Sequence, residues 1–165
     1  MLNLNDILSF YPENLRGFKQ NILKEYLQHK ILDIIFSTPY GGKLIFLGGT
    51  AIRIVHNSIR FSEDIDFDNL GLPPSELIKL SQTIKRQLEL EGYSVEIKTV
   101  FKNAFHCYIK FPEILYDYEL SGHKMEKILI QLDTEPQKYD YVHEKHLLNK
   151  FGLFRFINVT PATLL

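Results

Sequence analysis

The sequence contains almost no cysteine, no long apolar run and almost no net charge. Cys107 is the only cysteine among the 165 residues, which excludes an internal disulfide and a cysteine-based zinc site. Phe105 and Ile109 flank it at alternate positions. We therefore expect Cys107 to be a small buried residue rather than a nucleophile.

No apolar run approaches the roughly 20 residues that span a bilayer. Asn3, Asn5 and Asp6 interrupt the N-terminus, where a signal peptide would need apolar residues. These absences predict a soluble, cytoplasmic protein that does not bind a membrane. The formal net charge is only −1, so a nucleic-acid partner would have to bind a local basic patch.

What is present predicts one folded α/β (α+β) domain over residues 1–165. Apolar residues make up 45% of the chain and charged residues 24%, which is typical of a globular domain with a core. We expect helices within 1–40, a central core over 41–136 and the start of a further region over 137–165. The first turn of a helix is expected after Thr160, with Pro161 at its first position, and the chain stops on the apolar pair Leu164-Leu165. We therefore expect a helical C-terminal region to follow in a longer protein.

Apolar periodicity places the elements of this domain. Helices are expected within 13–37, over 50–57 and after Pro73-Pro74, with Ser75 as N-cap and Gly92 as the C′ residue. Short apolar or alternating runs predict strands at 43–47, 63–68, 93–100, 104–111, 125–133 and 154–159. Three further ranges are expected to form a hairpin loop, a short helix and the first turn of a helix, in the order 112–124, 142–150 and 160–165.

The most informative stretch carries two carboxylates, Asp64 and Asp66, in an acidic-apolar alternation. A strand has a side-chain period of two, so both would point to one face, roughly 6.5–7 Å apart along the strand. Mg²⁺ (or Mn²⁺) is usually held by one or two carboxylates together with substrate phosphates. A D-x-D pair also occurs by chance at solvated strand ends, but the glycines upstream favour a metal site.

Gly48, Gly49 and Thr50 end the preceding apolar run. Glycine allows the backbone to approach a ligand closely, and a helix beginning here would direct its N–H groups at a phosphate. The Thr50 hydroxyl could add one more hydrogen bond to a phosphate oxygen. The alternative is a tight strand-to-helix turn that binds nothing.

Other residues are weaker candidates. Arg53, Arg60 and Ser62 could contact phosphate, although a surface or structural ion pair is an equal alternative for each arginine. Lys124 and Lys127 could do the same. A third carboxylate would complete a two-metal site and could deprotonate an attacking hydroxyl. Asp133, on the same strand face as Gln131, is the best candidate for this metal ligand and base; a turn-forming aspartate is the alternative. Asp68 shares the acidic face but is expected beyond the cluster, and His143 and His146 are expected on an exposed helix face.

The patterns F-L-G-G-T-A-I-R at 46–53 and I-R-F-S-E-D-I-D-F at 59–67 resemble the AbiEii/AbiGii toxin family of nucleotidyltransferases, within the DNA polymerase β-like superfamily. The resemblance implies a nucleotidyltransferase fold, with a mixed β-sheet flanked by helices and a helical region after it. It also implies Mg²⁺-dependent transfer of NMP from an NTP to an acceptor hydroxyl, which in some related toxins belongs to tRNA. An antitoxin protein is the implied partner.

By motif match, Gly48, Gly49 and Thr50 would contact the nucleotide phosphates, and Asp64 and Asp66 would bind metal. The chain departs from the family at the third acid, because Gln131 stands where a carboxylate is common and Asp133 follows two residues later. Two alternatives therefore stay open. One is a catalytically incomplete module that binds a nucleotide or a protein, and the other is a nuclease that uses the same metal pair.

Overall fold

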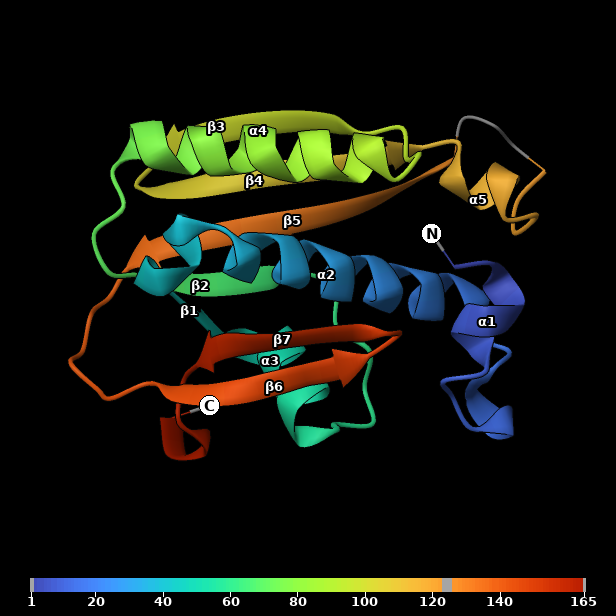
Figure 1. The fold of residues 1–165 in the computed structure, drawn as a ribbon, viewed down its shortest axis with the longest axis horizontal. Coiled ribbons are helices and arrows are strands. Elements are labelled where there is room, and N and C mark those ends of the chain that lie inside the picture. Colours follow the sequence, from blue (N-terminus) through green and yellow to red (C-terminus); the bar gives the residue numbers. More distant parts are fainter. Residues whose placement is uncertain (1, 123–125, 165) are drawn as a thin grey trace.

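The computed structural model describes residues 2–122 and 126–164, which form one seven-stranded mixed sheet with helices packed on it (Figure 1). The strand order is β3-β4-β5-β2-β1-β7-β6. β1 pairs with β7 and β2 pairs with β5 in parallel, and all other neighbours are antiparallel. The expected mixed sheet flanked by helices is confirmed.

The helices are α1 (Leu4–Leu8), α2 (Lys19–Ser37), α3 (Gly48–His56), α4 (Pro74–Leu90) and α5 (Ile114–Asp117), and 3-10 turns form at Glu13–Leu15, Pro39–Lys43 and Ala162–Leu164. The strands are β1 (Leu44–Leu47), β2 (Ile65–Asn69), β3 (Glu96–Lys102), β4 (Ala104–Pro112), β5 (Lys127–Pro136), β6 (Glu144–Lys150) and β7 (Leu153–Val159).

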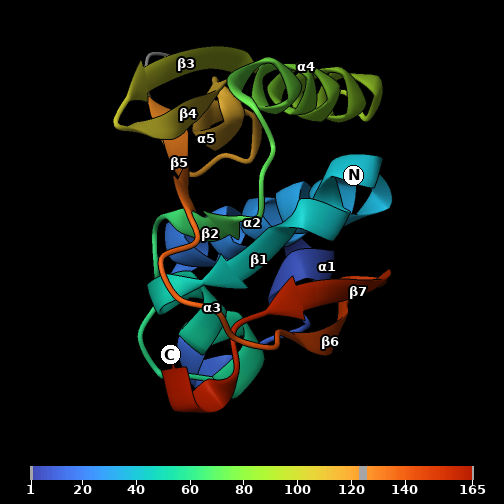
Figure 2. The same ribbon diagram turned by 90° about the vertical axis from the view of Figure 1, so that its left-hand side faces the viewer.

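Alternation on the strands separates a core face from an open face. On β4, Phe105, Cys107, Ile109 and Phe111 are buried while the residues between them are partly exposed. α2 and α4 lie over this apolar face (Figures 1 and 2). Cys107 is 1% exposed, and burial raises the pKa of its thiol to about 12. The expected buried thiol is therefore confirmed.

α4 illustrates one confirmed and one wrong local prediction. Gly92 has φ +98° and is the C′ residue of a Schellman motif, with the N–H of Tyr93 donating to the carbonyl of Leu88. Ser75 is not the N-cap. The helix begins at Pro74, whose fixed φ suits the first helical position and whose missing N–H needs no acceptor.

The prediction for residues 142–150 is wrong. They form the edge strand β6, paired with β7, instead of a short helix. The expected loop at 112–124 also contains the short helix α5, and the last turn is a 3-10 turn at Ala162–Leu164. No helix in the described ranges is both long enough and apolar enough to cross a bilayer.

Candidate active site

The site is built around the turn between β1 and α3. Gly48 has φ +84°, a conformation that side chains rarely adopt, and a Cβ there would lie 2.7 Å from Oδ2 of Asp66. A Cβ on Gly49 would lie 3.2 Å from the hydroxyl oxygen of Ser62. The two glycines thus allow this backbone to approach an acidic side chain and a hydroxyl closely. The turn and the acidic segment, apart in sequence, form one site.

Thr50 holds the acidic segment against this turn. Its side chain is completely buried, and its hydroxyl donates to the carbonyl of Asp64 and lies 2.8 Å from the hydroxyl of Ser62. Gln28 on α2 donates to the carbonyls of Ser62 and Glu63 at 2.9 and 3.0 Å. The Thr50 hydroxyl therefore has a bracing role in this structure, and contact between it and a phosphate oxygen remains a prediction.

Asp64 and Asp66 line the same cavity. This cavity has a volume of about 420 Å³ and is also lined by Gly49, Arg60 and Ser62. Asp66 lies on β2, whereas Asp64 precedes the strand, which begins at Ile65 rather than at residue 63. Hydroxyl, glycine backbone, guanidinium and carboxylate groups therefore meet in one hollow.

Asp133 completes the acidic group from a neighbouring strand. Asp66 and Asp133 are register partners on the parallel strands β2 and β5, so their side chains share the open face of the sheet. Burial, then the charges of Asp133 and Asp64, raise the pKa of Asp66 to about 6. Burial and Asp133 also raise the pKa of Asp64, against an opposing effect from Lys24. The three carboxylates therefore repel one another, and a cation would relieve that repulsion.

His106, which the sequence analysis missed, holds Asp133. Its Nδ1 donates to Oδ1 of Asp133 at 2.6 Å from the register-paired position on β4. Nε2 of Gln131 donates to both carboxylate oxygens of Asp133, at 2.9 and 3.2 Å. The expected sharing of one face by Gln131 and Asp133 is thus confirmed. His106 lies between core residues of an alternating strand, and only the sheet register reveals its partner.

Arg53 forms a structural ion pair, which was one of its two alternatives. Its guanidinium donates to Glu25 on α2 at 2.8 and 3.3 Å and lies 4.5 Å from the ring centre of Phe61. Tyr11 donates to the same carboxylate at 2.6 Å, and Lys150 lies 3.7 Å from it. Burial opposes ionisation, but these partners hold the pKa of Glu25 below its usual value.

Arg60 is exposed and has no salt bridge within the described ranges. Of the two arginines near the glycine turn, it is therefore the one available to a ligand.

A second cavity, of about 630 Å³, opens beside Asp64. Lys24 from α2 and Lys127 from β5 line it, together with Gln20, Asn21 and Gln131. Neither lysine has an acidic partner within 4 Å in the part of the chain that the structure describes. Lys124 lies outside the described residues. Glu63 and Asp64 also line this cavity, so the two lysines are local basic groups in a hollow of mixed charge and are available to contact a phosphate group.

The donor set fits a hard divalent cation. Carboxylate and hydroxyl oxygens lie beside the glycine turn, and oxygen is the ligand atom that Mg²⁺ prefers. Across residues 2–122 and 126–164, no three His, Cys, Asp or Glu side chains form a ready-made metal cluster. This suits Mg²⁺, which keeps several waters and takes substrate phosphates as ligands. In this site, Asp64, Asp66 and a triphosphate would bind the cation together with its waters.

Three other candidates lie apart from this centre. Asp68 is on the same strand face, but it accepts a hydrogen bond from Tyr141 and faces a different cavity. The expected helix bearing His143 and His146 is wrong, because His146 lies on β6 and His143 precedes that strand. Burial and the neighbouring His56 lower the pKa of His146.

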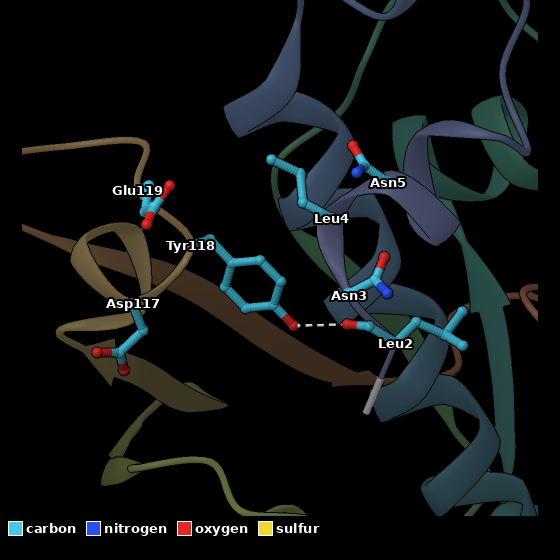
Figure 3. A pocket seen from close by; sticks show the side chains of 7 residues that line it. All are labelled: Leu2, Asn3, Leu4, Asn5, Asp117, Tyr118 and Glu119. Carbon is cyan, nitrogen blue, oxygen red and sulfur yellow. Dashed lines mark hydrogen bonds between the residues drawn. The ribbon is translucent and has the colours of Figure 1, made fainter.

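A cavity of about 520 Å³ lies between residues 2–5 and 117–119 (Figure 3). The ring of Tyr118 extends across the gap, and its hydroxyl donates to the carbonyl of Leu2 at 2.9 Å. No predicted site residue lines this hollow. It is a packing contact between α5 and the N-terminal segment rather than part of the acidic site.

Comparison with known proteins gives the family and the fold of this chain. The family model described as "Nucleotidyl transferase AbiEii toxin, Type IV TA system" matches residues 30–160. No curated protein sequence matches the chain.

Two solved structures share the fold at 17% sequence identity, each covering 87% of this chain. One is JHP933 from Helicobacter pylori, with a TM-score of 0.56, and the other is a protein provisionally described as a nucleotidyltransferase from H. pylori, with a TM-score of 0.55. The chain spans 53% and 54% of their lengths, or about half of each.

Proposed function

Because the chain belongs to the AbiEii nucleotidyltransferase toxin family, we propose that it transfers a nucleoside monophosphate from an NTP to an acceptor hydroxyl, with Mg²⁺ (or Mn²⁺) as cofactor. The observation that carries the proposal is the position of Asp66, whose carboxylate fills the space that a Cβ on Gly48 would need and whose register partner is Asp133. Asp66 thus lies beside both the glycine turn and Asp133, and Asp64 lines the same cavity as Asp66.

The triphosphate would lie in the cavity of Gly49, Ser62 and Arg60. Gly49 and Ile52 of α3 line this cavity, so backbone N–H groups at the start of the helix would be available to phosphate oxygens, and the Arg60 guanidinium would add positive charge. Asp64 and Asp66 would hold the metal, which neutralises phosphate charge and polarises the phosphorus–oxygen bonds when bound. Catalysis would come mainly from positioning and charge stabilisation.

Asp133 would act on the acceptor. As the acceptor oxygen bonds to the α-phosphorus, its proton passes to a carboxylate oxygen of Asp133, and the bond to the β-phosphate oxygen breaks to release pyrophosphate. His106 and Gln131 are positioning residues, because their hydrogen bonds fix the rotamer of Asp133. This arrangement supports Asp133, rather than a residue at position 131, as the third acid.

An RNA acceptor, tRNA included, is favoured by the second cavity. Lys24 and Lys127 lack acidic partners among the described residues and lie beside Asp64, where they could bind a phosphate backbone. NTPs and RNA are cytoplasmic substrates, so the proposed reaction would take place in the cytoplasm. From the family we further propose a toxin role with an antitoxin protein as partner.

The test is transfer from each α-phosphate-labelled NTP to bulk tRNA by the full-length protein. We expect labelled tRNA with wild type and none with Asp66→Ala, while Asp117→Asn, an exposed carboxylate away from the site, behaves as wild type. Unchanged transfer by Asp66→Ala would refute the metal role.

Two alternatives predict different products. A catalytically incomplete module, which the tethering of Asp133 by His106 would favour, binds Mg²⁺-NTP in calorimetry without labelling any RNA. A nuclease shortens the RNA instead of extending it. Either result would overturn the transfer reaction.

A further inference from the structure

A fourth cavity adjoins the glycine turn and differs chemically from the two polar cavities that Asp64 lines. It has a volume of about 660 Å³ and is lined by Gly48, Leu47 and Leu164, with Asp68, Tyr139 and Tyr141 supplying its polar groups. The phosphate cavity adjoins Gly49, the next residue along the same turn. A ligand whose phosphates lie over Gly49 could therefore extend past Gly48 into this hollow.

Tyr139 is an exposed aromatic residue on the wall of this cavity. Its side chain is 79% exposed, and within residues 2–122 and 126–164 it forms no hydrogen bond, ion pair or ring contact. A large aromatic ring on a cavity wall, without a packing role, offers a flat surface on which another ring can stack. Apolar side chains of Leu47 and Leu164 complete walls suited to a planar, largely apolar group.

The charge of this cavity selects against phosphate. Asp68 and Glu135 are register partners on β2 and β5, and both line the hollow. Lys138 pairs with Glu135 at 3.3 Å, but Asp68 has no cationic partner among the described residues. An acidic wall repels phosphate oxygens and accepts hydrogen bonds from hydroxyl and amino groups. The group that fits is therefore neutral and rich in donors.

Tyr141 fixes the orientation of that acceptor. Its hydroxyl donates to Oδ2 of Asp68 and lies 3.4 Å from the hydroxyl of Thr160. The other oxygen of Asp68, Oδ1, accepts no hydrogen bond from the part of the chain that the structure describes. Asp68 thus keeps one oxygen free to accept a hydrogen bond, in the same cavity as the exposed ring of Tyr139. Together they suit a ring that carries hydroxyl or amino donors.

We propose that this cavity binds the nucleoside part of the NTP, with Tyr139 stacking on the base and Asp68 accepting a hydrogen bond from it or from the ribose. This assignment rests on the proposed function, because the phosphates must lie over Gly49 for the nucleoside to reach the hollow. It adds the residues that would hold the nucleoside of the NTP, which the two polar cavities do not supply.

Calorimetry on the full chain tests the assignment with two kinds of probe. One kind is an NTP, with each of the four tried in turn, and the other is inorganic tripolyphosphate; Mg²⁺ is present with both. Base–aromatic stacking contributes about 1–3 kcal/mol, so Tyr139→Ala should weaken binding of the best NTP about tenfold or more. Tripolyphosphate binding should not change, because it has no base. Tyr139→Phe should keep NTP binding, and Phe154→Ala, an exposed aromatic on β7, is the matched control.

The outcomes separate this assignment from the transfer reaction. If wild type binds both probes and Tyr139→Ala binds both as tightly, the nucleoside site is wrong and the phosphate site stands. If Tyr139→Ala weakens both probes equally, the side chain is structural and the nucleoside site is again wrong. If wild type binds neither probe, the proposed function fails and the nucleoside site fails with it.

Discussion

Asp66 on β2 stands beside Asp133 on the parallel strand β5, and the two carboxylates share the open face of the sheet. Burial and the charge of Asp133 raise the pKa of Asp66 to about 6. The folded protein therefore stores electrostatic repulsion at the residue that we propose binds metal. Stability and function should depend on this residue in opposite directions.

Asp66→Asn should raise the free energy of unfolding at pH 8 and leave it nearly unchanged at pH 4. A folded pKa of about 6, above the usual 3.8, gives stability that is complete below pH 3.8 and is lost as the pH rises through 6. Because the group is partly solvated, we expect a gain of only about 1 kcal/mol at pH 8. Urea unfolding at both pH values measures it, with Asp117→Asn as the control.

Added Mg²⁺ gives a second readout of the same variant. A ligand that binds only the folded state raises the free energy of unfolding. Mg²⁺ should therefore stabilise wild type, but not Asp66→Asn, which lacks the carboxylate that we propose binds it. An equal shift of both proteins would place the cation elsewhere.

Gly48→Ala should destabilise the protein and abolish Mg²⁺-nucleotide binding. The new Cβ would meet Oδ2 of Asp66 at 2.7 Å, and φ +84° strains any residue with a side chain by about 1–2 kcal/mol. Gly71→Ala carries the same kind of strain at φ +123° with nothing within 4 Å, and Gly42→Ala carries neither. Unfolding and calorimetry on all three separate strain from the clash. Normal nucleotide binding by Gly48→Ala would show that the close approach is not needed.

Asp133→Asn should lower the transfer rate by about 10²–10⁴-fold, the range for loss of a general base. His106→Ala should lower it less, about tenfold, because Gln131 still donates to Asp133. Neither change should alter the KM for NTP, since the triphosphate lies over Gly49. Tyr108→Phe, two residues along the same strand face, is the control. A His106→Ala effect confined to KM would contradict its positioning role.

Much of the sheet could be predicted because β4 and β5 alternate along their length and end at proline, and β1 is a short apolar run that Gly48 follows. Alternation locates β3 and β4 within two or three residues of their bounds, and the Schellman glycine of α4 was placed correctly. β6 was not predicted. It is an edge strand with mostly exposed or half-buried side chains and with adjacent leucines at 147 and 148, so its pattern lacks the period of two.

The candidate site divides in the same way. The glycine turn and the acidic pair are close in sequence and carry a recognisable motif, so their association was predictable. The roles of His106 and Arg53 depend on partners that are distant in sequence. Sheet register brings His106 to Asp133, 27 residues away, and helix packing brings Arg53 to Glu25, 28 residues away. No local pattern encodes such contacts. The buried Glu25 lies in the middle of α2, where an exposed carboxylate would look the same in sequence.

His29 should make the fold sensitive to acid. It is 3% exposed, and burial lowers its pKa to about 4 against a hydrogen bond to the carbonyl of Glu25; the charges of Glu25, Lys150 and Arg53 act on it as well. A depressed histidine pKa gives stability that is complete above pH 6.5 and is lost as the pH falls to 4, here about 3 kcal/mol. Unfolding between pH 4 and 7 should show a shallower slope for His29→Leu. Equal slopes would mean that His29 does not carry the effect.

Arg53 and Arg60, both near the glycine motif, should respond to substitution in opposite ways. Arg53→Ala leaves the buried Glu25 without its closest cation, so we expect a loss of about 3 kcal/mol in the free energy of unfolding. NTP affinity of the molecules that remain folded should stay close to wild type. Arg60→Ala should leave stability within about 0.5 kcal/mol, as for an exposed surface residue, and weaken Mg²⁺-NTP and Mg²⁺-tripolyphosphate binding by about tenfold. Denaturant unfolding and calorimetry on the two variants distinguish the roles, and a reversed pattern would place the triphosphate against Arg53 instead of over Gly49.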